Sequence, residues 1–198
     1  MNTGQKPRLI VGISGSSGLP YGTRLLEVLR KLATHEVHLI LTDAAKLNIS
    51  VETDWRVKDV EALADVVHNV MNISASIASG SFRTEGMIVA PCSIRTLSAI
   101  THSFADNLLV RAADVVLKER RRLVVMPREA PLHTGHCKLL YEASLLGIIV
   151  FPPMPTFYGR PRTIDDMVDT TIGRVLDLLG IDAGLVKRWT GVANKSKK

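Results

Sequence analysis

Three things are scarce in this sequence of 198 residues: cysteine, aromatic side chains and long apolar runs. With only Cys92 and Cys137, the chain cannot form the disulfide framework of a small secreted domain, and we expect two reduced thiols in a cytoplasmic protein. No apolar run reaches the length of a membrane-spanning helix, so we expect no membrane span. Aromatic residues make up 5% and are absent from the basic runs, which argues against nucleic-acid binding despite a net charge of +6.

The composition fits one globular domain. Hydrophobic residues make up 46%, which is enough to bury a sizeable core in a chain of this length. The end of the chain is strongly basic, since Lys195, Lys197 and Lys198 supply three of the six excess positive charges. We expect one domain over residues 1–190, followed by a solvated basic tail over residues 191–198.

Short apolar runs alternate with helical patterns along the chain. The predicted strands are Arg8–Ser14, Val37–Leu41, Gly86–Ala90, Leu123–Met126 and Gly147–Phe151. The predicted helices cover residues 21–30, 93–102, 107–120, 134–146 and 163–179. This alternation predicts an α/β fold, a single-domain doubly wound parallel sheet (Rossmann-like or flavodoxin-like) with helices on both faces. Residues 50–85 are less regular, and the small polar residues of Ser74–Ser81 predict a mobile loop.

The first predicted strand runs into a turn rich in glycine and serine, Gly15-Ser-Ser-Gly18, which opens a helix. Such a turn lets the backbone approach a phosphate closely, and the free N–H groups and dipole of the helix attract the anion. The turn has neither the spacing of a dinucleotide-binding motif nor that of a P-loop, and it would also suit an ordinary connection. We expect the phosphate group of a ligand at this turn.

Polar residues follow the other predicted strands as well. The carboxyl ends of parallel strands share one edge of the sheet, where ligands of such folds bind. This edge should collect Thr42, residues 91–96, residues 127–129 and residues 152–160. We therefore expect a phosphorylated ligand whose remaining part lies against small and apolar residues.

Several of these segments resemble the UbiX family of flavin prenyltransferases, and the resemblance runs over nearly the whole chain. The segments that carry it are Gly12–Gly18, Glu52–Asp54, Ala78–Ser81, Pro91–Leu97, Arg111–Arg120, Pro127–Leu132, Pro152–Tyr158 and Arg188–Gly191. The resemblance implies transfer of a dimethylallyl group from dimethylallyl monophosphate to N5 and C6 of reduced FMN, without a metal. It further implies a homo-oligomer, a dodecamer, whose prenylated FMN serves a UbiD-type decarboxylase.

The same resemblance implies the site residues. Those for FMN would be Gly15, Ser16, Ser17, Thr42, Ser93, Ile94, Arg95, Thr96 and Arg128. Those for the prenyl phosphate would be Arg111, Lys118, Arg128, Tyr158 and Arg174, and the catalytic candidates are Ser17, Glu52, Lys118 and Glu129. Either Glu129 or the retained phosphate would remove the C6 proton. Because Lys118 and Arg174 are far apart in sequence, the fold or a neighbouring subunit must bring them together. Asp43 stands where relatives often carry lysine, which puts the affinity for flavin in question.

Two other functions remain open: an FMN-dependent cysteine decarboxylase of the same fold, and a non-catalytic flavin carrier or decarboxylase subunit. Lys118-Glu-Arg and Pro127-Arg-Glu argue against the decarboxylase, and the intact set of charged site residues argues against a carrier. The mass of the flavin after reaction would separate these functions, because a carrier leaves FMN unchanged.

Two groups of residues resemble metal ligands and one cysteine resembles a nucleophile, but we expect a structural role for each. Asp165, Asp166 and Asp169 match in letters the Asp-Asp-x-x-Asp cluster of Mg²⁺-dependent prenyl transfer, but they begin a predicted helix, where carboxylates complement the dipole. His133, His136 and Cys137 also lie at a predicted helix start. Cys92 is expected to be a small buried residue. We expect no metal site.

Overall fold

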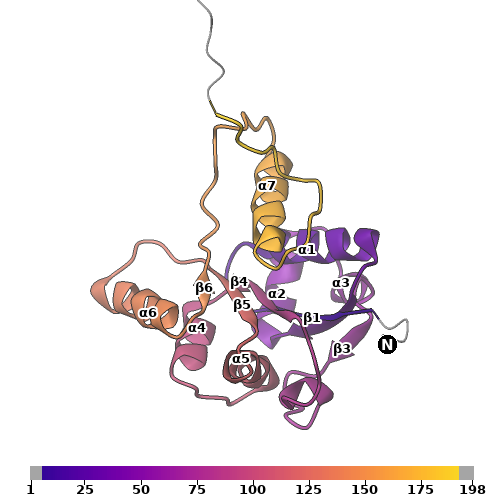
Figure 1. Cartoon of the computed structure of the whole chain (residues 1–198), viewed down its shortest axis with the longest axis vertical. Helices are drawn as coiled ribbons and strands as arrows, with labels where there is room; N and C mark the ends of the chain where they lie inside the picture. Colours follow the sequence, from indigo (N-terminus) through magenta and orange to yellow (C-terminus); the bar gives the residue numbers. More distant parts are fainter. Residues whose placement is uncertain (1–5, 192–198) are drawn as a thin grey trace, which may run out of the picture.

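The computed structural model describes residues 6–191 (Figure 1). Its strands are β1 (Arg8–Ile13), β2 (Glu36–Leu41), β3 (Val66–His68), β4 (Gly86–Cys92), β5 (Arg122–Pro127) and β6 (Ile149–Val150). Its helices are α1 (Leu19–Leu32), α2 (Asp43–Glu52), α3 (Val57–Glu61), the 3-10 turn η1 (Ser76–Ala78), α4 (Ile94–Thr101), α5 (Leu108–Lys118), α6 (Thr134–Leu145) and α7 (Ile164–Asp177).

The six strands form one parallel sheet in the order β3-β2-β1-β4-β5-β6. The strand order reverses between β1 and β4, so the connections after these two strands leave in opposite directions. A crevice at the carboxyl ends of the strands is expected at such a switch point. The doubly wound parallel sheet predicted from the sequence is confirmed, with the strand order of a Rossmann fold.

Helices cover both faces of the sheet, and alternate strand residues divide between two cores. On one face Leu9, Val11 and Ile13 pack with the apolar sides of α1 and α7, and with the buried residues of α2 and α3. On the other face Ile10 and Val89 pack with α4, α5, α6 and η1. The period of two in β1 thus supplies both cores from one continuous apolar run.

Most predicted elements are present, and the differences lie where burial is slight. The helices α2 and α3 and the strand β3 fall outside the predicted elements. Only Ala45 and Ile49 of α2 are buried, and β3 is three residues long with no buried residue. The predicted loop over Ser74–Ser81 contains η1, whose Ile77 is buried in the core.

The chain between β6 and α7 forms an arm. Figure 1 shows residues 152–163 rising from β6 away from the sheet, and α7 returning along α1. Asp169 of α7 accepts hydrogen bonds from Arg24 of α1 at 2.5 and 3.1 Å, which joins the two helices. Among residues 6–191 no helix is long and apolar enough to cross a membrane. The predicted basic tail lies, after Gly191, outside the described residues.

We predict that Gly22→Ala destabilises the fold although alanine favours helices. Gly22 lies in α1, and a Cβ atom there would overlap the backbone oxygen of Ala90 and lie 2.8 Å from Ile13 Cδ1. Overpacking of this kind costs about 1–3 kcal/mol of unfolding free energy, more than the gain in helix propensity. Urea unfolding measures the change, and Gly159→Ala, where nothing lies within 4 Å, is the matched control. Equal stability of the two variants would contradict the packing described here.

Candidate active site

Backbone hydrogen bonds align the ends of four neighbouring strands. Thr42 N–H after β2 donates to Ile13 O at the end of β1, over 3.1 Å. Ser14 N–H donates to Pro91 O in β4, and Arg128 N–H after β5 donates to Cys92 O, each over 3.2 Å. The four loops predicted to share one edge of the sheet therefore begin side by side, as expected for carboxyl ends of parallel strands.

The hydroxyl group of Ser14 ties the two loops of the switch point together. Ser14 is fully buried, and its Oγ donates to Pro91 O at 3.2 Å while accepting from Ser93 N–H at 2.8 Å. A buried hydroxyl group with both a donor and an acceptor partner fixes the groups that it joins. Ser14 thus sets the distance between the Gly15–Gly18 turn and the start of α4.

The turn after β1 approaches its neighbours too closely for a side chain. A Cβ atom on Gly15 would overlap the Cβ atom of Ala44 in α2. Ser16 is buried, and its Oγ has no hydrogen-bond partner among the described residues. A buried hydroxyl group without a partner is rare and marks a place where a ligand can supply one.

The N–H groups at the start of α1, which were expected to be free for a phosphate, already have an acceptor. The carboxylate of Glu52, at the end of α2, accepts from Gly18 N–H at 2.7 Å and from Leu19 N–H at 3.0 Å. No side chain of α1 itself caps this end. Glu52 therefore satisfies the orphan donors and complements the helix dipole, so the phosphate cannot bind to these two N–H groups. This cap could not be predicted from the sequence, because the capping residue lies far away in the chain.

The start of α4 keeps donors available. Ser93 caps the helix, since its Oγ accepts from Thr96 N–H at 3.2 Å and donates to Thr96 Oγ1 at 3.0 Å. Within residues 6–191, the backbone N–H groups of Ile94 and Arg95 have no acceptor. These two amides and the positive end of the helix dipole make α4, not α1, the helix that can receive an anion.

A pocket of about 390 Å³ opens beside these groups. Five residues predicted for FMN line it, namely Gly15, Thr42, Ser93, Arg95 and Thr96. Apolar side chains on its other wall are Val70, Met71, Ala99 and Val110. Small-molecule sites typically combine such an apolar wall with a few polar groups. Asp43 also lines the pocket and adds a negative charge at its edge.

Three further predicted residues lie next to this cleft. Arg128 donates through Nε to Ser17 O at 3.3 Å, which joins the loop after β5 to the turn after β1. Glu129 follows, exposed, and its carboxylate accepts from Ala130 N–H at 3.1 Å. Glu52 lines a second pocket of about 570 Å³ between α1, α2 and α7. The structure therefore brings the predicted FMN residues, Glu52 and Glu129 to one edge.

The other predicted phosphate ligands lie elsewhere in the same chain. Lys118 ends α5 just before β5 begins, at the amino edge of the sheet. The six residues of β5 place this edge about 20 Å from Arg128. Arg174 lies one turn before Leu178, whose carbonyl group accepts from Arg122 at the start of β5 over 2.8 Å, so it also lies toward the amino edge. Tyr158 lies on the arm, with its ring edge-on to Trp189 at 5.8 Å.

Arg111 lies between these two groups. It follows the pocket residue Val110 in α5, but its guanidinium group donates to Ala78 O at 3.3 Å and to Asp114 at 2.7 Å. One chain by itself therefore does not gather Arg111, Lys118, Tyr158 and Arg174 around one phosphate.

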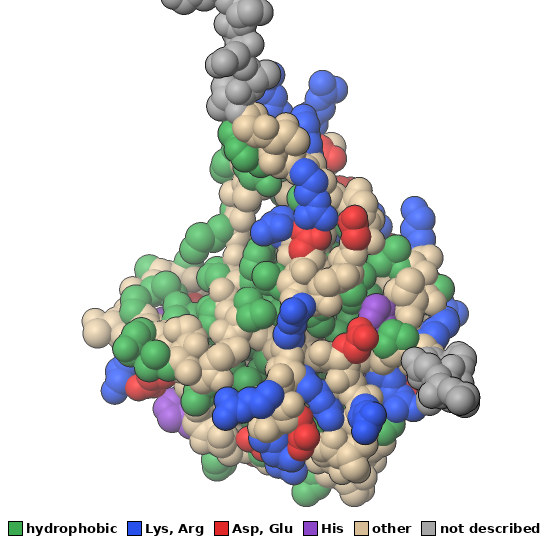
Figure 2. All heavy atoms as spheres, viewed as in Figure 1, with side chains coloured by type: hydrophobic (Ala, Val, Ile, Leu, Met, Phe, Trp, Pro, Cys, Tyr) green, Lys and Arg blue, Asp and Glu red, His purple; other side chains and the backbone are tan. Residues whose placement is uncertain are grey.

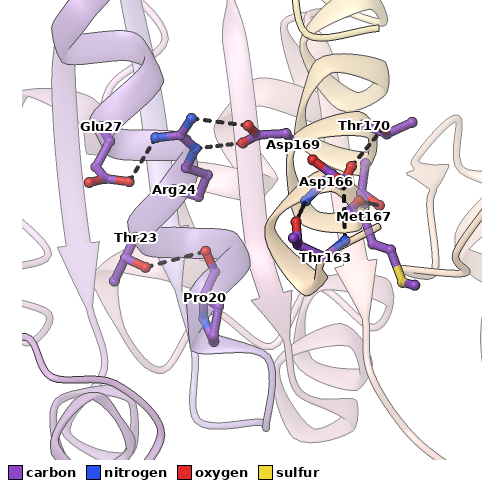
Figure 3. A network of polar contacts seen from close by, with 10 residues as sticks. Pro20, Thr23, Arg24, Glu27, Thr163, Asp166, Met167, Asp169 and Thr170 are labelled. Carbon is purple, nitrogen blue, oxygen red and sulfur yellow. Dashed lines mark hydrogen bonds and ion pairs between the residues drawn. The ribbon is translucent and has the colours of Figure 1, made fainter. Parts of the chain in front are cut away.

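The three acidic residues at the start of α7 have different surroundings. Asp166 accepts from Arg162 N–H and Thr163 N–H and completes a capping box, and these donors hold the pKa of its carboxyl group below the ordinary value. Asp169 is paired with Arg24, as Figure 3 shows. Asp165 lines the pocket that contains Glu52. The helix-start role predicted for Asp166 is confirmed.

The cysteine and histidine residues have structural surroundings. Cys92 is fully buried, and burial raises the pKa of its thiol, so it is a packing residue as expected. His133 caps α6, because its Nδ1 accepts from Gly135 N–H at 3.0 Å, and its ring lies 3.6 Å from that of His136. Cys137 is exposed on the same helix.

Sequence reasoning missed Ser14 and the wall of the pocket formed by Val70 and Met71. Ser14 could have been found, because a serine that ends a buried apolar run stands at the carboxyl edge of its strand. Val70 and Met71 follow the short strand β3, which itself gave no signal.

Comparisons with known proteins agree with this geometry. The Flavoprotein family model matches residues 2–176. The chain is 54% identical over 186 residues to the flavin prenyltransferase UbiX of Escherichia coli (strain K12), which covers 93% of this chain and 98% of the relative.

Two solved structures are similar over their full length. A dodecameric FMN-dependent UbiX-like decarboxylase from Escherichia coli O157:H7 is 48% identical with a TM-score of 0.91, covering 93% of this chain and 100% of that one. AnUbiX in complex with FMN and dimethylallyl pyrophosphate is 44% identical with a TM-score of 0.93, covering 96% and 100%.

We predict that the cap that Glu52 provides for α1 can be measured separately from the catalytic role expected for this residue. Glu52→Ala leaves the N–H groups of Gly18 and Leu19, at the start of α1, without an acceptor and should cost about 1–2 kcal/mol of unfolding free energy. Glu52→Gln keeps an acceptor oxygen and should recover most of that stability. Thermal unfolding and FMN binding, measured on both variants, test the assignment. If Glu52→Gln proves as unstable as Glu52→Ala, capping is not the role of this side chain.

Proposed function

The chain belongs to the UbiX family of flavin prenyltransferases, and from this membership we propose that it joins a dimethylallyl group to reduced FMN. The new bonds form at N5 and C6 of the flavin, and the product is prenylated FMN for a UbiD-type decarboxylase. One observation carries the proposal. At the switch point between β1 and β4, hydrogen-bond donors suited to a phosphate group lie beside a pocket with an apolar wall.

The residues present fit FMN. The unpartnered Ser16 hydroxyl group and the free N–H groups of Ile94 and Arg95 are suited to its phosphate, with the dipole of α4 behind them. Gly15 lets the turn pack directly against α2, because a Cβ atom there would overlap the Cβ atom of Ala44. Val70 and Val110 offer an apolar wall to a flavin ring. Ser17, Thr42, Ser93, Thr96 and Arg128 complete the proposed set.

The prenyl donor needs cations for its phosphate and dryness for its allyl group. We assign the phosphate to Arg111, Lys118, Arg128, Tyr158 and Arg174. Positive groups and a phenol hydroxyl stabilise the negative charge that the departing phosphate gains as the allylic C–O bond breaks. The apolar wall of the cleft keeps water from the allyl cation. Four cationic side chains supply more positive charge than a monophosphate dianion needs, so the proposal includes no metal.

Proton movements accompany the two new bonds. Reduced FMN, when bound, supplies the nucleophilic atoms N5 and C6. When N5 bonds to the allyl group, the allylic C–O bond breaks and N5 loses its proton. Closing the ring at C6 then requires the allyl double bond to gain one proton and C6 to lose one. Glu129 lies beside Arg128 at the cleft and is a carboxylate base within the same loop, and the departing phosphate is the second candidate for this proton.

The proposed donor site requires more than one copy of the chain. Lys118 and Arg174 lie toward the amino edge, about 20 Å from the cleft, so we propose that a neighbouring subunit supplies them. The chain carries the exposed apolar side chains that such contacts bury. Tyr141, Leu145 and Leu146 are exposed on or beside α6, and Phe157 and Trp189 on the arm and the segment beside it. Figure 2 shows hydrophobic side chains over α6 and along the arm. A homododecamer is the proposed assembly.

The family membership favours this enzyme over a cysteine decarboxylase of the same fold and over a flavin carrier. We also propose that the enzyme works in the cytoplasm, where the two free thiols remain reduced.

Weighing the flavin after reaction tests the proposal. Full-length protein, reduced FMN and dimethylallyl monophosphate are incubated with EDTA, and the flavin is analysed by mass spectrometry. We predict a gain of one isoprene unit that EDTA does not reduce. An unchanged flavin mass would indicate a carrier. In a parallel incubation with a peptide that ends in cysteine, loss of carbon dioxide from the peptide would indicate a decarboxylase.

The same assay examines the donor and the metal. Dimethylallyl diphosphate, the charge of which normally requires Mg²⁺, should react more slowly than the monophosphate. Turnover that stops in EDTA and returns with Mg²⁺ would overturn the metal-free mechanism and direct attention to Asp165, Asp166 and Asp169.

A further inference from the structure

Lys118 is already paired within its own chain. Its Nζ lies 2.6 Å from Oε1 of the next residue, Glu119, and this ammonium group lowers the pKa of the Glu119 carboxyl group. Adjacent side chains do not face each other within a helix, and this pair lies at the end of α5, where Glu119 is the C-cap residue with a ψ of 7°. A carboxylate thus engages one of the three N–H donors of the Lys118 ammonium group.

A glycine lies directly under this pair. A Cβ atom on Gly80 would overlap Glu119 Oε1 and lie 2.9 Å from Lys118 Nζ. Both atoms are ends of flexible side chains, so a methyl group there would push the ion pair aside and leave the backbone in place. The bare backbone at Gly80 is therefore the surface on which the two charged groups rest.

The loop that carries Gly80 is held from the other side. Arg121 donates to Gly80 O at 2.7 Å, to Phe82 O at 3.0 Å and to Thr84 Oγ1 at 3.4 Å. Arg111 adds a bond to Ala78 O. These contacts fix the loop without using Lys118, which leaves its ammonium group free to change partners.

We propose that Glu119 is a positioning residue for Lys118 and a built-in competitor of the prenyl phosphate. Its carboxylate holds the ammonium group over Gly80 until the phosphate of the donor displaces it, and it returns when inorganic phosphate departs. The proposal rests on the function proposed above, because it takes Lys118 as a phosphate ligand. It explains why an acidic residue directly follows a lysine that is expected to bind an anion.

The variant Glu119→Gln removes the competitor and keeps the size of the side chain. With FMN-loaded, full-length protein, the KM for dimethylallyl monophosphate should fall about 2- to 5-fold, as expected when an exposed ion pair is lost. The kcat should not rise, and inhibition by inorganic phosphate should strengthen by a similar factor. High salt should reduce the difference from the wild type, because it screens the charge. Gly80→Ala moves the Lys118 ammonium group from its position while Glu119 stays attached to it. This variant should therefore raise the KM for dimethylallyl monophosphate.

Two controls make the outcome specific. Asp59→Asn removes one negative charge from an exposed pair with Arg56 on α3 and should leave both constants unchanged. In Lys118→Met the further change Glu119→Gln should have no effect on phosphate affinity. Unchanged KM and unchanged phosphate affinity in Glu119→Gln would overturn the proposal.

Titration calorimetry with inorganic phosphate distinguishes the failure of this proposal from failure of the proposed function. If no variant prenylates FMN but Glu119→Gln still binds phosphate more tightly, the competitor role stands and the assigned reaction is wrong. If the wild type prenylates FMN and Glu119→Gln behaves like it in both assays, only the role of Glu119 is wrong.

Discussion

The whole cleft depends on how two strands that are distant in sequence end beside each other. Ser14, buried at the end of β1, bonds to both Pro91 and Ser93 at the end of β4. Because the hydroxyl group has a donor and an acceptor partner, neither loop can move without breaking a buried hydrogen bond. Glu52 adds a second constraint from α2 by capping α1. With α1 capped in this way, the start of α4 is the helix end that can receive an anion.

The sequence predicted the sheet well because its strands are buried on both faces. Continuous apolar runs such as those of β1 and β4, in a chain where they alternate with helical segments, are typical of strands in a parallel sheet. It did not predict α2 or β3, because α2 buries only Ala45 and Ile49 and β3 buries no residue. The capping of Gly18 by Glu52 could not be predicted either, since that contact exists only after the fold has formed.

The site residues also differ in how far the sequence alone predicts them. Residues after β1 and β4 could be assigned to one cleft from topology alone. The phosphate ligands could be named only through a resemblance, and the structure places Lys118 and Arg174 toward the opposite edge of the sheet. A sequence carries no direct signal of which residues meet across a subunit boundary. In the proposed assembly, the exposed side chains of Tyr141, Phe157 and Trp189 would lie at such boundaries.

The central claim is therefore that the active site is completed between subunits, and complementation measures it directly. Ser16→Asp should be inactive because its carboxylate repels the phosphate of FMN, and Lys118→Ala should be inactive because it lacks a donor ligand. Mixed oligomers of the two variants contain some sites with an intact cleft and an intact Lys118 from another chain. Random mixing in equal amounts should restore about a quarter of the wild-type rate of FMN prenylation, since each site draws its two parts independently. Mixed oligomers that assemble but remain inactive would contradict the account.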